Sequence, residues 1–238
     1  MPVSSSGHLV LFNKIFGTSA DFVFFSVLLH VATLLAVVIV LWKDIKFLFA
    51  HPFSRPAKLL YVATIPTIII VLCFKGFFEN AFGGSLLPVC FVFTAVLLAV
   101  TQTLGTKATV SPKKITYKTS LMVGLMQGLA VLPGISRSGS TICTAVLCGA
   151  DKQQASRFSF LLSIPIILAS IGYELLDVII NQKPFFDVGV LPTLLAFLSA
   201  FVVGLLCVKF MLTVFQKINL WWFSAYLIII AGVSFFVV

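Results

Sequence analysis

Long runs of apolar residues without charge are the feature of this sequence that most constrains its fold. Each run is close to the length that a helix needs to cross a bilayer, about 20 residues. The runs lie at residues 22–42, 59–74, 86–104, 158–173, 188–208 and 218–238. Only 10% of the 238 residues are charged, against about 25% in soluble domains. The sequence therefore predicts an all-α integral membrane protein with six transmembrane helices, forming one polytopic domain over residues 1–238.

Residues 121–150 are also apolar, but they do not form a simple span. Two arms, 121–132 and 141–150, flank the polar sequence PGISRSGS at 133–140. The arms would be about 18 and 15 Å long as helices, roughly half of a 30 Å hydrocarbon core. We expect a re-entrant helical hairpin whose tip, called the second tip (residues 133–141), lies inside the membrane, buried in protein or facing water.

The basic residues of the loops indicate an orientation. Successive loops lie on alternate sides of the membrane. Counted from the start of the chain, one side receives Lys14, Lys75 and Lys183. The other side receives twelve: Lys43, Lys46, Arg55, Lys58, Lys107, Lys113, Lys114, Lys118, Lys152, Arg157, Lys209 and Lys217. Because cytoplasmic loops are enriched in Lys and Arg, we expect the twelve in the cytoplasm and both termini outside. These loops also account for the net charge of +9, so we expect no nucleic-acid partner.

The chain contains an internal repeat. The sequence PVSSSG at 2–7 matches PGISRSG at 133–139 with one insertion, and FSVLL at 25–29 matches FSFLL at 158–162 nearly in register. We divide the chain into a first repeat, about 1–106, and a second, about 119–238. Each copy consists of a tip followed by three spans. Because three is an odd number, we expect the second copy to be inverted relative to the first. The two tips can then meet inside the membrane, as in transporters whose binding sites lie at the midplane.

The first tip (residues 2–8) differs from the second in what precedes it. The second tip follows a complete helical arm, whereas the first stands at the beginning of the sequence, so its hairpin is truncated. We expect an arm of about 20–25 residues upstream of Met1, a length taken from a half-membrane helix.

The second tip holds the candidate anion site. Arg137 is a basic residue within an apolar hairpin, and a cation at this depth indicates a functional site. A guanidinium and the N–H groups of a helix N-terminus both suit phosphate oxygens. The alternative is an arginine that only caps neighbouring carbonyls. The candidate substrate-binding residues around it are Gly134, Ser136, Ser138, Gly139 and Thr141.

The first tip holds the candidate catalytic pair. Ser5 and His8 are three residues apart at a predicted helix start, where they could supply a nucleophile and a general base. The neighbouring Ser4, Ser6 and Gly7 are candidate substrate-binding residues. Elsewhere, we interpret Trp221, Trp222 and Tyr226 as an aromatic belt at the membrane interface.

These two tips carry a resemblance to a known family. PVSSSGHL at 2–9, HVATLLA at 30–36, PGISRSGST at 133–141 and FSFLLSIP at 158–165 closely resemble undecaprenyl pyrophosphate phosphatases of the bacitracin-resistance type. The resemblance extends over essentially the whole chain. It implies six spans plus two re-entrant hairpins in inverted repeats, in the inner (plasma) membrane of a bacterium. It also implies an enzyme that removes the terminal phosphate of a C55 isoprenyl pyrophosphate at the outer face, recycling the cell-wall lipid carrier and conferring bacitracin resistance.

Position by position, the resemblance implies that Ser5 and His8 are the catalytic serine and histidine and that Arg137 binds phosphate. It also implies a divalent cation, Mg²⁺ or Ca²⁺, held by a Glu-x-x-x-Glu motif on the first arm. Those carboxylates are absent from this sequence, so no metal ligand is named. We expect the native reading frame to continue upstream of Met1 through this arm, and the 238 residues alone to have little activity. Leu227 stands where family members often have Arg.

Two other functions were considered. A polyprenyl-phosphate transporter or flippase would use the same anion site without hydrolysis, and phosphate release distinguishes the two. The acid phosphatases of the other membrane superfamily need a histidine four residues before an aspartate. None of the three histidines in this sequence meets this condition. The expected partner is the isoprenyl pyrophosphate lipid, and a homodimer is left open.

Overall fold

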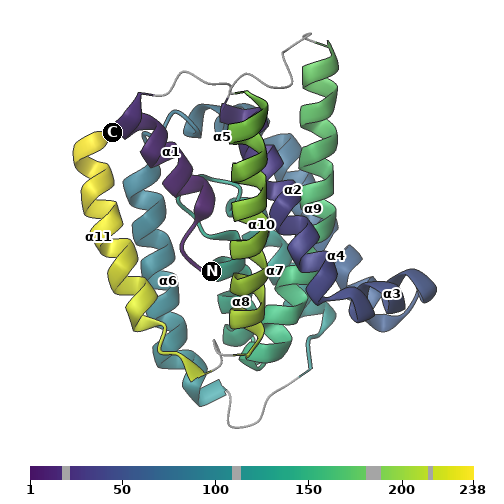
Figure 1. Ribbon diagram of the computed structural model, residues 1–238. Helices are drawn as coiled ribbons and strands as arrows, with labels where there is room; N and C mark the ends of the chain where they lie inside the picture. The colour runs from purple at the N-terminus through teal and green to yellow at the C-terminus, as the bar shows by residue number, and fades with distance from the viewer. Residues whose placement is uncertain (18–21, 109–113, 181–188, 214–216) are drawn as a thin grey trace.

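The chain is built from helices joined by turns. The computed structural model describes residues 1–17, 22–108, 114–180, 189–213 and 217–238, and these ranges contain helices and no strand (Figure 1). The helices are α1 (Ser5–Phe16), α2 (Phe22–Val40), α3 (Trp42–Ala50), α4 (Arg55–Cys73), α5 (Lys75–Ala81), α6 (Leu87–Ala108), α7 (Tyr117–Leu129), α8 (Arg137–Leu147), α9 (Lys152–Ile180), α10 (Val190–Thr213) and α11 (Trp221–Val237). The predicted all-α class is confirmed.

Each predicted span falls on one of these helices. By length and composition, α4, α6, α9 and α10 can each cross a membrane, and the bent pair Leu28–Val40 and Trp42–Ala50 is a fifth candidate if it counts as one span. The last predicted segment forms α11, an apolar helix of 17 residues, which is about 26 Å long. The described residues thus form a multi-pass membrane protein, with four or five spans by this test instead of the six predicted.

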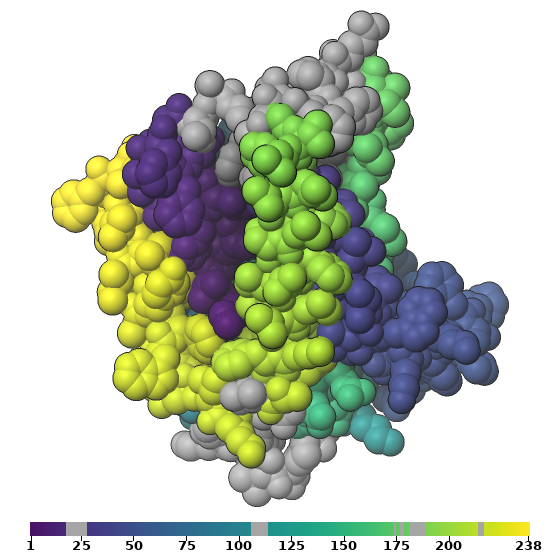
Figure 2. Space-filling model, in the orientation of Figure 1, coloured from purple at the N-terminus to yellow at the C-terminus, as the bar shows by residue number. Residues whose placement is uncertain are grey.

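The first predicted span, 22–42, ends earlier than expected. Helix α2 stops at Val40, and α3 begins at Trp42 at an angle of 81° to it. The apolar run ends here, because Lys43 and Asp44 follow directly. Figure 1 shows α3 projecting sideways from the bundle, and Figure 2 shows the same projection in the space-filling view. The buried Ile45 of α3 packs against the protein.

Helices α7 and α8 form the predicted hairpin, and they pack against each other. With 13 and 11 residues, the two arms are about 20 and 17 Å long, so neither can cross the bilayer alone. Both arms begin about four residues before the predicted positions, because capping side chains fix their starts. The Thr116 hydroxyl accepts the N–H of Thr119 at 3.2 Å, and Ser136 caps α8 in the same way.

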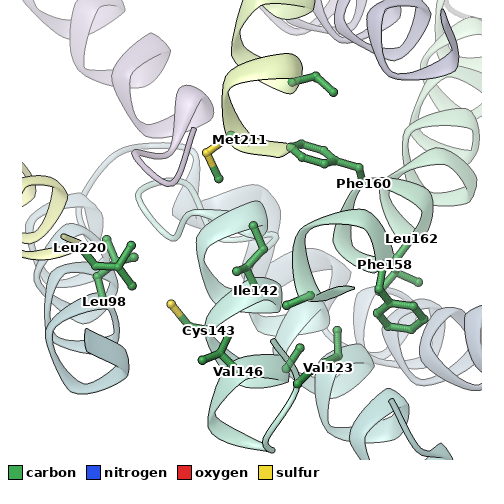
Figure 3. Close-up of a cluster of buried hydrophobic side chains, with 14 of the residues drawn as sticks. Leu98, Val123, Ile142, Cys143, Val146, Phe158, Phe160, Leu162, Met211 and Leu220 are labelled. Carbon is green, nitrogen blue, oxygen red and sulfur yellow. The ribbon is translucent and has the colours of Figure 1, made fainter. Parts of the chain in front are cut away.

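Helix α8 lies at the centre of the molecule. It packs against α6, α7 and α9, and every residue from 139 to 146 is buried. Figure 3 shows Ile142, Cys143 and Val146 of α8 lying between Leu98 and Leu220 on one side and the cluster around Phe158 on the other. The second tip, which leads into α8, is therefore held by the most buried part of the fold.

The other arm, α7, is fixed by close backbone contact with α4. A Cβ at Gly124 would lie only 2.2 Å from the carbonyl oxygen of Ala63, so these backbones meet directly. The Thr67 hydroxyl donates to the Gly124 carbonyl at 2.8 Å, and the Ser120 hydroxyl donates to the Leu59 carbonyl. Small residues and interhelical hydrogen bonds are the usual means of joining membrane helices.

Candidate functional site

The two tips end in the same local structure. Ser4 precedes α1, and its hydroxyl accepts the N–H of Gly7 at 3.3 Å. Ser136 precedes α8, and its hydroxyl accepts the N–H of Gly139 at 3.1 Å. Both pairs are related by a shift of 132 positions, the shift found when the tips are aligned in the sequence. A serine cap and a glycine in the first turn therefore open both helices.

The tips are bonded to each other through Ser4. Its hydroxyl donates to the carbonyl of Ile135 at 3.4 Å and accepts the N–H of Gly134 at 3.2 Å, in addition to the N–H of Gly7. One donated and two accepted bonds use the full capacity of a hydroxyl. They also offset the strained backbone of Ser4, whose φ of 59° costs about 1–2 kcal/mol for an L residue. The expected meeting of the tips occurs at this residue.

Two glycines allow this contact. A Cβ at Gly7 would lie 2.7 Å from the Cα and N of Gly134, and 2.8 Å from a ring carbon of Phe91. Gly134 has a φ of +95°, and a Cβ there would lie 2.6 Å from that of Cys90. A larger residue at Gly7 would separate the tips, and a larger residue at Gly134 would push the second tip away from α6.

Arg137 is the first residue of α8 and is half-buried. No acceptor among the residues that the structure describes binds its guanidinium, so it does not cap neighbouring carbonyls there. A guanidinium presents five N–H donors in a fixed fork. The backbone N–H groups in the first turn of α8 lie beside the guanidinium, and two of these N–H groups have no hydrogen-bond acceptor within the helix. This end of α8 can therefore bind an anion through both side chain and backbone.

The remaining residues of the second tip mostly bind within the protein. The Ser138 hydroxyl donates to the Met1 carbonyl at 3.1 Å, which adds a second link between the tips. Thr141 donates to the Arg137 carbonyl at 2.8 Å and shares a 2.6 Å hydrogen bond with Ser159 of α9. These contacts hold the start of α8 in place, while the buried hydroxyl of Ser140 has no partner in the described ranges.

Ser5 and Ser6 form the first turn of α1, with Ser5 exposed and Ser6 half-buried. Neither hydroxyl bonds to another residue that the structure describes. The sequence pairs Ser5 with His8, and both lie in the first two turns of one helix, three positions apart. In this structure the ring nitrogens of His8 bind other groups, so Ser5 and His8 are neighbours without a hydrogen bond between them.

His8 is held by residues from three elements. Its Nδ1 lies 2.8 Å from the carbonyl oxygen of Ser4, and its Nε2 lies 2.7 Å from the hydroxyl of Tyr226 on α11. Its ring stacks on Tyr226 and meets Phe91 of α6 edge-on. The sequence interpretation of Tyr226 as part of an interfacial belt did not anticipate this contact between its hydroxyl and the first tip.

Thr94 was also missed by the sequence analysis. This buried residue of α6 donates to the carbonyl of Gly134 at 3.2 Å and accepts the N–H of Ser136 at 3.1 Å. Thr94 and Tyr226 are 132 positions apart, the shift that relates the tips. Each therefore holds the tip of the other half of the chain, and the repeat is the signal that could have found them.

The residues of the tips do not form a site for Mg²⁺ or Ca²⁺. These cations prefer carboxylate oxygens, and the tips supply hydroxyls, an imidazole and a guanidinium. Three acidic side chains are described, and each is engaged elsewhere: Asp44 with Arg157, Glu79 with Lys75, and Asp151 with the N–H of Gln154. No group of three metal-ligating side chains occurs in the described ranges. The site that the residues of the two tips form instead carries positive charge.

Comparison with known proteins agrees with this geometry. The family model of bacitracin resistance protein BacA matches residues 1–233. An undecaprenyl-diphosphatase from Carboxydothermus hydrogenoformans is 40% identical over 240 residues, which cover 100% of this chain and 90% of the relative. Similar proteins of the same name come from Christiangramia forsetii (35% identical, 97% of this chain and 89% of the relative) and Desulfatibacillum aliphaticivorans (38% identical, 95% and 88%).

Proposed function

The chain belongs to the family of bacitracin resistance protein BacA, and from this we propose that it is an undecaprenyl-diphosphatase of a bacterial inner membrane. Its substrate is a C55 isoprenyl pyrophosphate, and its products are the monophosphate and inorganic phosphate. One observation carries the proposal. A guanidinium lies in a hairpin tip at the centre of the bundle, beside a helix N-terminus, with no acceptor bound to it in the described ranges.

We assign the roles as follows. The terminal phosphate binds to Arg137 and to N–H groups at the starts of α1 and α8, with Ser4, Ser6, Ser136 and Ser138 beside it. A hydroxyl, that of Ser5 or of water, attacks the phosphorus, and His8 accepts its proton. The bond between phosphorus and the bridging oxygen then breaks, and the C55 monophosphate leaves. Attack by water gives inorganic phosphate directly, whereas attack by Ser5 gives a phosphoserine, which water hydrolyses to inorganic phosphate and the free serine hydroxyl. His8 as the attacking group is the alternative.

Three parts of the sequence interpretation stay predictions. The two halves of the chain are proposed to be inverted repeats, which the paired caps Ser4 and Ser136 support. The divalent cation is expected from the family resemblance alone, and because the tips offer no carboxylate, no step is assigned to it. A homodimer is likewise left to measurement.

We propose that the site opens to the outer face. Segments predicted to be cytoplasmic lie together, since Arg55 donates to the carbonyl of Ile115 at 3.3 Å and Arg157 lies 3.8 Å from Asp44. Helices α6 and α10 both end toward the lower part of Figure 1, whereas α1 ends at the upper end. The basic end faces the cytoplasm by the positive-inside rule.

The test uses the protein expressed from its native gene and reconstituted in lipid nanodiscs. Its phosphate release from C55 pyrophosphate is measured with and without EDTA. Loss of release in the Arg137→Lys and Ser5→Ala variants would support the assignment. Movement of intact pyrophosphate across vesicles without phosphate release would instead identify a transporter.

A further inference from the structure

The contacts of His8 determine which of its nitrogens carries a proton. Nδ1 lies 2.8 Å from the carbonyl oxygen of Ser4. A carbonyl oxygen can only accept, so in neutral His8 it is Nδ1–H that donates. Nε2 then carries the lone pair, and the Tyr226 hydroxyl, 2.7 Å away, must donate to it. The two neighbours thus define one tautomer.

Tyr226 also fixes the plane of the imidazole. The two rings are parallel within 3°, with centroids 5.7 Å apart, while Phe91 meets the imidazole at 75° and 5.4 Å. The imidazole is therefore packed on two sides, and a rotation about its side-chain bonds would break both the stacking and the hydrogen bond.

The helix that carries Tyr226 is itself tied to α6. The hydroxyl of Ser224 donates to the carbonyl of Ala95 at 2.8 Å, and Leu227 is completely buried. Because Phe91 belongs to α6 as well, the α6–α11 pair presents both rings to His8 as one unit. Tyr226 is thus set by backbone contacts that do not involve the first tip.

Thr94 gives an independent reason to assign Tyr226 a role in the site. It is the residue 132 positions earlier, on α6, and it bonds to the second tip as Tyr226 bonds to the first. The α6–α11 pair therefore holds both tips, through one hydroxyl each. A residue that served only the membrane interface would have no reason to occupy this matching position.

We propose that Tyr226 is a positioning residue for the proposed phosphatase reaction. Until substrate binds, the Tyr226 hydroxyl holds the His8 imidazole with its Nε2 lone pair directed at the α6–α11 pair. The Tyr226 ring keeps the plane of the imidazole parallel to its own. This inference rests on the proposed function for its effect on turnover, but the arrangement of His8 can be measured without it.

The decisive variant is Tyr226→Phe, which keeps the ring and removes the hydroxyl. Loss of one hydrogen bond to the base corresponds to about tenfold in kcat, and we expect KM to be unchanged and the pH–rate profile to shift. Tyr226→Leu, which also removes the stacking, should lower kcat further. The control is Tyr61→Phe, because Tyr61 lies exposed on α4; it should behave as wild type.

Nitrogen-15 NMR of labelled histidine in nanodiscs provides a readout that needs no activity. Wild-type His8, identified by its absence in His8→Gln, should show a protonated Nδ1 and an unprotonated Nε2. In Tyr226→Phe the Nε2 signal should move while the thermal stability stays close to wild type. An unchanged Nε2 signal, or a loss of turnover matched by unfolding, would overturn the proposal. If the wild type releases no phosphate, the proposed function fails, but the NMR result still decides the contact.

Discussion

Gly7→Ala is the sharpest test of the contact between the tips. The added methyl group would lie 2.7 Å from the Cα and N of Gly134 and 2.8 Å from the ring of Phe91. Ordinary contact begins near 3.4 Å, so the backbones of the tips must separate by about 0.7 Å (3.4 minus 2.7) and the Phe91 ring must shift as well. The neighbour is backbone, which cannot rotate away as a flexible side chain can.

The magnitude follows from three terms. Overpacking costs about 1–3 kcal/mol, and the hydrogen bond from Gly134 to Ser4 that the shift breaks is worth about 1 kcal/mol. Alanine in place of a helical glycine returns about 0.5–1 kcal/mol. We therefore expect a net loss of about 1–3.5 kcal/mol in the free energy of unfolding, and a displacement near 1 Å that lowers turnover about 100-fold.

The assays are thermal unfolding and phosphate release in nanodiscs, with Gly232→Ala as the matched control. Gly232 is also helical, but a Cβ there meets nothing within 4 Å, so this variant should be neutral or stabilised by about 0.5–1 kcal/mol. Wild-type stability and turnover in Gly7→Ala would refute the close contact of the tips.

Three further predictions test other parts of the molecule. Arg137→Lys should lower turnover by about 100-fold or more at normal expression, because a point charge cannot replace the guanidinium fork, and wild-type turnover would contradict the phosphate-binding role. Gly124→Ala should lower the unfolding free energy by about 1–3 kcal/mol in thermal unfolding, because its methyl group would overlap the Ala63 carbonyl, and unchanged stability would exclude the α4–α7 backbone contact. In a cysteine-depleted background, impermeant maleimide should label Asn80→Cys and spare Lys114→Cys in intact cells, and the reverse pattern would invert the proposed orientation.

The helices could largely be predicted from the sequence, because burial in a bilayer leaves long apolar runs that are visible locally. Their ends could be predicted less well. The arms of the hairpin start at capping residues, Thr116 and Ser136, which satisfy free N–H groups whatever the hydropathy of their neighbours. The break after Val40 comes two residues before the apolar run ends at Trp42, so hydropathy locates it only approximately.

The candidate site, like the helices, could be predicted only in part from the sequence. The meeting of the tips was predicted from the sequence repeat, because an inverted repeat would place equivalent segments at one depth. The groups that join and orient them, Ser4, Thr94 and Tyr226, did not follow from any local pattern. Their partners are between 40 and 218 residues away, and a hydroxyl in an apolar helix looks the same in sequence whether it bonds to its own turn or to another helix.

The hydrogen bonds of Ser4 also determine how early in synthesis the contact between the two tips can form. Its partners on the second tip are 130 and 131 residues later in the chain, which a ribosome adding about 5–20 residues per second reaches after about 7–26 s. Until then the first tip lies in or near the membrane with its Ser4 bonds to the second tip unmade. The contact between the tips therefore forms only after residue 135 has been made, and the contact of His8 with Tyr226 must wait for α11.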